Sequence, residues 1–176
     1  ERIQKAESHV RNYLHEGLLK KESLKPVVFE TFLRNHRESL HLARKLFDEK
    51  ESNLWIVVIS YYSMFYMANA VLFRLGYKIG DKIPHKVTVD ALIVFVRNKL
   101  KKIFLEEYEE SQNEALPGIK ADTLIDEFDK ERAKRGIFQY ETTSVEKHSK
   151  AITSLKRAKN FIFEMEKLLE DLNKSL

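Results

Sequence analysis

The sequence predicts an all-α protein, and three observations lead to this prediction. Glycine and proline, which end or interrupt helices, number only five and three among 176 residues. Most segments are rich in Leu, Lys, Glu, Arg and Ala, which have high helix propensity. The segment Trp55–Tyr77 is apolar or aromatic on nearly every side of a helix, which is typical of a central helix buried in a bundle.

The first part of the chain predicts two helices. Residues 1–21 combine mixed charge with a narrow apolar stripe, and the segment Ser23–Pro26 ends this helix because the residue before proline avoids the helical conformation. Residues 29–50 have apolar side chains every three or four positions, which indicates an amphipathic helix. We therefore expect an N-terminal helical extension over residues 1–27 and a helical bundle over residues 28–172.

The third expected helix is the apolar segment Trp55–Tyr77. Ser52 or Asn53 can cap its start, and Gly76 or Gly80 can end it. Its length would allow a membrane span, but polar residues interrupt it and about a third of the chain is charged, so we expect no membrane location. Because both faces are apolar, the helix must be covered on several sides, by other helices or by a second protomer.

The second half of the chain predicts four more helices, over residues 87–96, 105–114, 121–136 and 143–172. Pro84 suits a first helical turn, and Asp81 is a possible cap. The β-branched residues of Val87–Val96 would also suit a strand, but no strand partner is evident elsewhere, so we expect a helix. Pro117 and Gly118 separate the last two helices from the rest.

Composition and motifs exclude several function classes. The chain has no cysteine, which rules out disulfides and thiolate chemistry and fits a reducing, cytoplasmic setting. Phosphate-binding glycine loops, hydrolase elbows and histidine–glutamate zinc motifs are absent, so we expect no metal and no cofactor. The formal net charge of +4 allows an acidic partner without requiring one. Since the chain starts with Glu1 rather than Met, we expect it to begin inside a longer polypeptide.

The most unusual polar residues are two arginines at the end of the expected helix 121–136. Arg132 and Arg135 continue the apolar stripe that includes Ile125 and Phe128. They can extend into solvent at the helix end, where cations suit the helix dipole, or pair with nearby acids. Alternatively, they form an arginine pair at the edge of a cleft and bind phosphate.

Two further side chains are candidates for the same site. Tyr140 follows Arg135 by five residues, and its phenol could face a cleft or fill the core. His85 lies in the first turn of an expected helix, where it could bind an anion, act as an acid or base, or remain an ordinary polar surface residue. Basic runs at residues 97–102 and 147–159 are interleaved with acids and are typical of solvated helix faces, but charges that converge in space would form a phosphate-binding groove.

These features together resemble the HEPN superfamily, and within it small prokaryotic proteins. The resemblance covers residues 29–169 and lies in the order of three motifs: SYYSMFYMANAVLFRLGY at Ser60–Tyr77, PHK at Pro84–Lys86, and the arginine pair before RGIFQYE. It implies an up-and-down helical bundle that forms a homodimer. It also implies a cleft between protomers lined by the late arginine motif, where RNA is cut without metal.

The resemblance carries site roles over to this chain. Arg135 takes the place of the arginine that steadies the phosphate, with Arg132 as a second phosphate-binding residue. Tyr140 stands where active members have histidine. A tyrosine with a pKa near 10 is a poor base but can donate a proton. His85 could supply an imidazole if the fold brings it to the cleft.

Two functions therefore follow from the sequence. The first is an RNA-binding protein or metal-independent endoribonuclease, with the toxin of a toxin–antitoxin pair as one form of it. The second is a catalytically inactive helical module that binds a nucleotide, a nucleotidyltransferase antitoxin or another protein partner. Tyr140 would then be a candidate for modification by the nucleotidyltransferase.

Overall fold

The computed structural model describes residues 1–118 and 140–174, with the backbone alone for residues 118 and 140–146. Its α-helices are α1 (Arg2–Glu16), α2 (Pro26–Asp48), α3 (Asn53–Arg74), α4 (Pro84–Phe95), α5 (Lys102–Ala115) and α7 (Tyr140–Lys174). A 3-10 turn, η1 (Leu116–Gly118), follows α5, and two short strands, β1 (Leu19–Lys21) and β2 (Tyr77–Ile79), form a ribbon. The predicted all-α class is confirmed.

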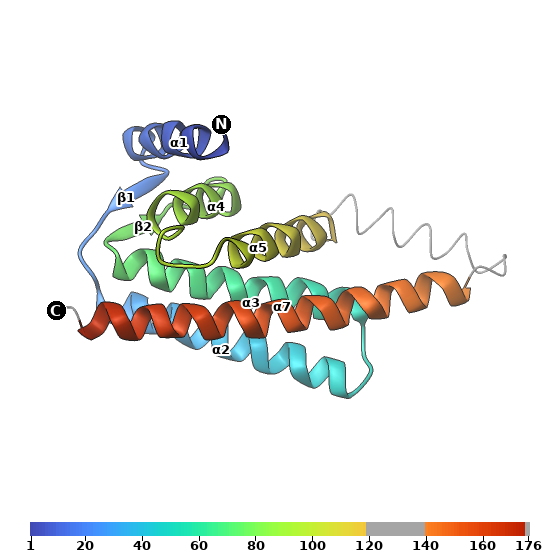
Figure 1. Ribbon diagram of the computed structural model, residues 1–176. Helices are drawn as coiled ribbons and strands as arrows, with labels where there is room; N and C mark the ends of the chain where they lie inside the picture. The colour runs from blue at the N-terminus through green and yellow to red at the C-terminus, as the bar shows by residue number, and fades with distance from the viewer. Residues whose placement is uncertain (119–139, 175–176) are drawn as a thin grey trace.

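The long helices α2, α3 and α7 lie side by side, and α5 covers the side of α3 and α7 away from α2 (Figure 1). At one end Asn53 of α3 contacts His148 of α7, and at the other Arg74 donates to Asn173 over 2.8 Å. Helices α3 and α7 therefore run parallel, whereas α2 returns antiparallel to both. This is the helical bundle that the sequence predicts.

Helix α3 is the centre of the core. The Ser52 side chain accepts a hydrogen bond from the Trp55 N–H over 3.4 Å and so caps the helix as predicted. By length and composition α3 is the one helix among the described residues that could cross a membrane, but 78% of its most apolar stretch is buried inside the fold. Its polar residues also bond internally: Ser63 donates to the Ser60 carbonyl and Asn69 to the Phe65 carbonyl.

The N-terminal segment differs from the single helix expected over residues 1–21. Helix α1 ends at Glu16, Gly17 follows with φ +72°, and the chain then enters β1. Strand β1 pairs antiparallel with β2, so Leu19 lies opposite Ile79 and is fully buried. Strand β2 begins at Tyr77, which the sequence places in the preceding helix, because main-chain pairing between distant segments leaves no local signal.

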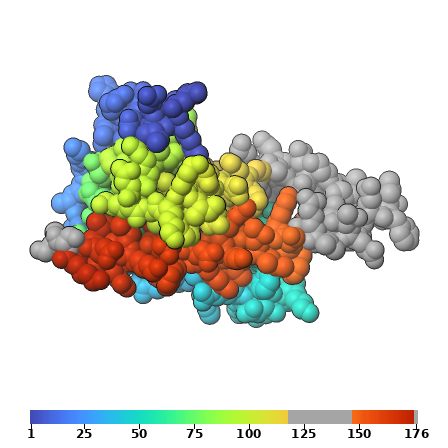
Figure 2. All heavy atoms as spheres, viewed as in Figure 1, coloured from blue at the N-terminus to red at the C-terminus, as the bar shows by residue number. Residues whose placement is uncertain are grey.

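Helix α1 rests on α4 and forms a raised block on the bundle (Figure 2). Its buried residues are Ala6, Val10 and Tyr13. The Tyr13 hydroxyl donates to Asp90 over 2.9 Å, and His9 Nδ1 lies 3.0 Å from the same carboxylate. The expected division into an extension and a bundle at residue 28 stays a prediction, although these contacts attach the extension firmly to α4.

Helices α4, α5 and α7 follow the sequence with small differences. The ambiguous segment Val87–Val96 is helical, with Pro84 in the first turn as predicted. The residue before the helix is Ile83, at φ +44°, rather than Asp81. Helices α5 and α7 are longer than expected, and the helix expected over residues 121–136 lies outside the described residues.

Candidate functional site

The late arginine motif is only partly within the described structure. Arg132 and Arg135 fall in the range 119–139, outside the described residues. Tyr140 is the first residue of α7, but its side chain is not described. The proposed roles of these three residues therefore stay predictions.

His85, the other candidate, lies in the first turn of α4 and is half-buried. Its Nδ1 is 2.7 Å from the hydroxyl oxygen of Tyr61 on α3. The rings of Tyr61, Tyr62 and Phe65 surround it, with centroids 5.5, 5.8 and 4.7 Å from the imidazole centroid. Burial lowers the pKa of His85, because desolvation disfavours the charged imidazolium. The ring is therefore neutral at pH 7, with one nitrogen that can accept a proton and one N–H that can donate a hydrogen bond.

The polar contact of His85 continues into the core. Tyr61 is fully buried, and its hydroxyl oxygen also lies 3.4 Å from Gln112 Oε1 of α5, a second possible acceptor of its hydrogen. Tyr108 packs against Tyr61 with ring centroids 5.7 Å apart. Burial raises the pKa of both phenols, so both stay protonated.

The Tyr61 hydroxyl controls which nitrogen of His85 holds the proton. It has one hydrogen to give. With that hydrogen directed to Gln112, Nδ1 of His85 must donate to the Tyr61 oxygen, and Nε2 is left as a base. With the hydrogen directed to His85, Nε2 carries the proton and becomes a donor. These contacts hold the His85 ring in place. Whether the Tyr61 hydrogen points to Gln112 or to His85 decides which tautomer of His85 is present.

His85 and Tyr140 lie at different levels of the bundle. Arg157 of α7 pairs with Glu110 of α5 over 2.5 Å. Gln112, two residues further along α5, contacts Tyr61, so Tyr61 and Arg157 lie at about the same level of the bundle. Tyr140 precedes Arg157 by 17 residues on α7, which is roughly 25 Å of helix. A site that includes both His85 and Tyr140 would therefore require a second protomer.

An open groove with aromatic walls lies where α2 packs on α3. We call it the aromatic groove; it is formed mainly by Leu42, Trp55, Ile59, Tyr62 and Tyr66, and its volume is about 430 Å³. Trp55 and Leu42 are 48% and 44% exposed. The four residues from α3 recur at intervals of four, three and four, so they form one stripe along the helix. Trp55 is exposed and the other three are partly exposed, and an apolar stripe that reaches the surface in this way is typical of an interaction surface.

Sequence reasoning identified His85 but missed its partners. Tyr61 sits within a run of aromatic residues that predicts core packing, and Gln112 is 51 residues further along the chain. No local spacing joins the three side chains. The sequence did indicate that both faces of α3 would need covering, by other helices or by a second protomer, and the aromatic groove lies on one of these faces. Among the described residues no group of three or more metal-ligating side chains is present.

Comparison with known proteins gives one match. The model of the HEPN domain matches residues 29–171, which is most of the chain. No curated protein and no solved structure matches the chain. The match begins at the fourth residue of α2 and ends near the last turn of α7, so α1 and the ribbon strand β1 lie outside it.

Proposed function

The chain belongs to the HEPN domain family, and on this premise we propose that it is an RNA-binding protein and a metal-independent endoribonuclease. HEPN domains have RNA-binding or nuclease-type functions in general. The observation that supports the proposal is the match over residues 29–171. Within this range Arg135 stands where the sequence resemblance puts the family arginine. The activity would be cytoplasmic, as the absence of cysteine suggests.

The proposed reaction is an attack of a ribose 2′-hydroxyl on the adjacent phosphorus. A bond from the 2′-oxygen to phosphorus forms, the bond from phosphorus to the 5′-oxygen breaks, and the products are a cyclic phosphate and a 5′-hydroxyl. Arg135 and Arg132 would stabilise the negative charge that grows on the phosphate oxygens. Tyr140, protonated at pH 7, would donate the proton that the leaving 5′-oxygen needs. The proton of the 2′-hydroxyl passes to His85 of a second protomer or to water.

The test uses purified protein and labelled tRNA or mRNA in EDTA, with four proteins compared. We expect Arg135→Ala to slow cleavage by about a hundredfold or more, because one charge-stabilising donor is lost. Tyr140→Phe should also slow it, whereas Tyr140→His should accelerate it, because an imidazole titrates near neutral pH and restores the family motif. RNA that stays intact with wild type and Tyr140→His, and binds to neither at low salt, would reject the proposal.

We propose further that the protein acts as a homodimer and that the aromatic groove is the interface between protomers. Its stripe is straight and apolar, so two copies related by a two-fold axis can bury the same residues against each other. Trp55→Glu should give a monomer in light scattering and lose cleavage. Val27→Glu is the matched control, because Val27 is 80% exposed and lies outside the groove. A wild-type protein that is monomeric at every concentration would reject this interface.

A second candidate function is an inactive module, and one observation favours it. Tyr140 replaces the family histidine, and the described His85 is already bonded to Tyr61. Such a module would bind a nucleotide or a nucleotidyltransferase partner of a toxin–antitoxin pair, with Tyr140 as a candidate modification site. Calorimetry with ATP, GTP and a nucleotidyltransferase encoded beside the gene tests this function. Absence of binding to all three, together with RNA cleavage, would exclude it.

A further inference from the structure

A second groove lies on the opposite face of α2 from the aromatic groove, where α2 packs on α7. We call it the basic groove; it has a volume of about 360 Å³ and includes Arg37, His41 and Arg44 of α2 and Lys159 of α7. The three α2 residues are spaced by four and by three, which places them on one face of the helix. Charges from two helices that are far apart in sequence therefore meet along one groove.

The cations of the basic groove are not neutralised by neighbouring acids. Among the described residues, Arg37, Arg44 and Lys159 form no ion pair, and Arg37 Nε donates only to the Leu33 carbonyl, over 3.1 Å. Glu166 is the acid that lines the groove, against three permanent positive charges. Since these cations line one groove, an anion bound there would interact favourably with all of them.

The floor of the groove contains a buried polar group without a partner. His36 is only 3% exposed, and its Nδ1 has no hydrogen-bond partner. Burial and the neighbouring Arg37 lower its pKa to about 4, so the ring is neutral at pH 7. A neutral imidazole can donate or accept a hydrogen bond, so a ligand hydroxyl that reached Nδ1 would give this group the partner it lacks.

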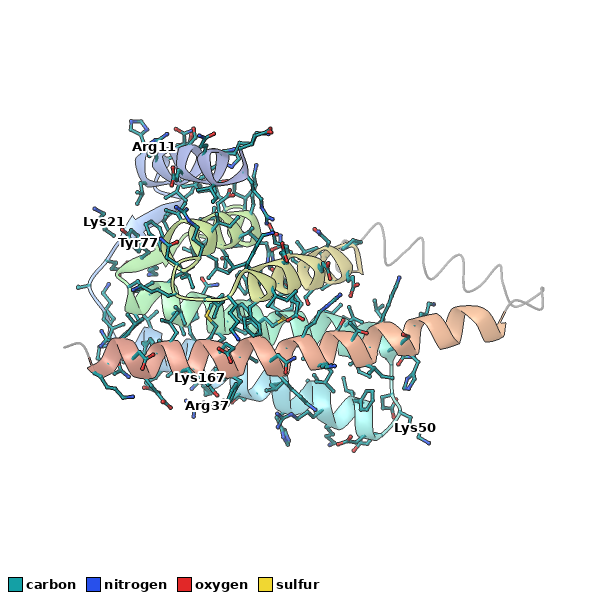
Figure 3. The ribbon with its side chains drawn as sticks, in the orientation of Figure 1. Arg11, Lys21, Arg37, Lys50, Tyr77 and Lys167 are labelled. Atoms are coloured by element: carbon teal, nitrogen blue, oxygen red, sulfur yellow. The ribbon has the colours of Figure 1, made fainter. Side chains whose placement is uncertain are left out.

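The edge of the groove presents an aromatic ring. Phe163 of α7 is 56% exposed, and Lys167 Nζ lies 4.2 Å from its ring centroid. Arg37 and Lys167 both lie along the edge where α7 passes α2 (Figure 3). Exposed rings beside rows of cations bind single-stranded nucleic acid, because bases stack on the ring while cations contact the phosphates.

We propose that the basic groove binds the phosphate backbone of single-stranded RNA, with one base stacked on Phe163. The preference for an anion follows from the groove itself, whereas the choice of RNA rests on the proposed function. The groove is distinct from the late motif, because Lys159 follows Tyr140 by 19 residues on α7, roughly 28 Å of helix. Only an RNA long enough to cover this distance contacts both places, so the groove acts as an accessory binding site.

The test compares two charge-reversed proteins with the same change in net charge. Arg37→Glu/Arg44→Glu alters the basic groove. Arg11→Glu/Lys21→Glu alters exposed residues of α1 and β1 on the opposite side of the molecule (Figure 3). Both are made in an Arg135→Ala background, which prevents cleavage during binding. Affinity for a fluorescent single-stranded RNA is measured by anisotropy in EDTA at several salt concentrations.

We expect the groove variant to reduce the slope of log affinity against log salt by about 1.4, since two phosphate contacts are lost on a single strand. Between about 50 and 200 mM salt, the Arg135→Ala parent should then lose about sevenfold more affinity than the groove variant. The control should keep the slope of this parent. Phe163→Ala should weaken binding of the RNA but leave the slope unchanged, because the ring has no charge.

Each failure has a distinct meaning. Equal slopes for the groove variant and the control, with RNA bound, would overturn the basic groove while leaving the proposed function intact. If wild type binds no RNA, the proposed function fails, and the anion preference of the groove is tested with tripolyphosphate instead. Equal affinity of the groove variant and the control for tripolyphosphate would overturn the basic groove as an anion site. With Arg135 restored, groove variants should raise KM for long RNA and leave cleavage of a dinucleotide unchanged. An equal loss on both substrates would also overturn the accessory role.

Discussion

The buried histidine of the basic groove predicts how stability depends on pH. His36 has an ordinary pKa of 6.5 when unfolded and about 4 when folded, because burial disfavours its charged form. Below pH 6.5 the unfolded chain therefore binds more protons at this position than the folded chain. The free energy of unfolding must fall as the pH drops from about 6.5 towards 4. His85, whose pKa is also lowered by burial, acts in the same direction.

The size of the effect follows from the two pKa values of His36. Proton binding to a group with pKa 6.5 in one state and about 4 in the other changes the free energy of unfolding by about 2 kcal/mol between pH 7 and pH 5. His36→Leu removes this titration and nearly preserves the volume of the side chain. The loss of stability between the two pH values should therefore be about 2 kcal/mol smaller in His36→Leu than in wild type.

Urea unfolding at pH 7 and pH 5, followed by circular dichroism, measures this difference. Contributions from His85 and the carboxylates are common to both proteins and cancel in the comparison. His41→Leu is the matched control, because His41 is an exposed histidine of the same helix, five residues further on. If His36→Leu and wild type lose the same stability between pH 7 and pH 5, His36 is not kept neutral by burial and the reasoning fails.

Three further predictions concern stability at neutral pH. Tyr61→Phe should lower the free energy of unfolding by about 1–2 kcal/mol, because His85 loses its partner. Asp90→Ala should cost a similar amount, because Tyr13 is left unpaired. In Asp90→Ala, amide hydrogen exchange should become faster in α1 than in the helices of the bundle. Equal protection of α1 and the bundle in this variant would contradict the prediction. Gly76→Ala should destabilise by about 1–2 kcal/mol in thermal unfolding, because Gly76 has φ +91° and the added Cβ meets no atom within 4 Å that could compensate. An unchanged Tm would contradict it.

The helices could be predicted from the sequence because their signals are local. The spacing of apolar residues in 29–50, the Ser52 cap and the position of Pro84 each depend on a few neighbouring residues. The β1–β2 ribbon could not be predicted, since three-residue strands have no periodic pattern and their partners lie far apart. Helix ends also shifted by several residues, as in α5, because tertiary contacts decide where a helix stops.

The candidate sites, like the ribbon, depend on contacts between distant segments that no local sequence signal predicts. His85 could be named from its place in the first turn of a helix, but its bond to Tyr61 depends on how α4 docks on α3. Lys159 belongs to a basic run for which the sequence predicts a solvated helix face, and on that helix alone the prediction is sound. Only the packing of α2 on α7 brings Arg37 and Lys159 to one groove. The groove forms only when separate helices pack together, so the sequence of one helix cannot predict it.

The two faces of α2 suggest how binding and assembly can coexist in this fold. Residues Glu38, Ser39 and Leu42 of α2 border the aromatic groove, whereas Arg37, His41 and Arg44 border the basic groove. A protomer that docks on the first face leaves the second face open to solvent. Dimerisation through the aromatic groove would therefore place two basic grooves on the outside of one particle. A single long RNA could then contact both, and its affinity would exceed that of one groove through the raised effective concentration at the second.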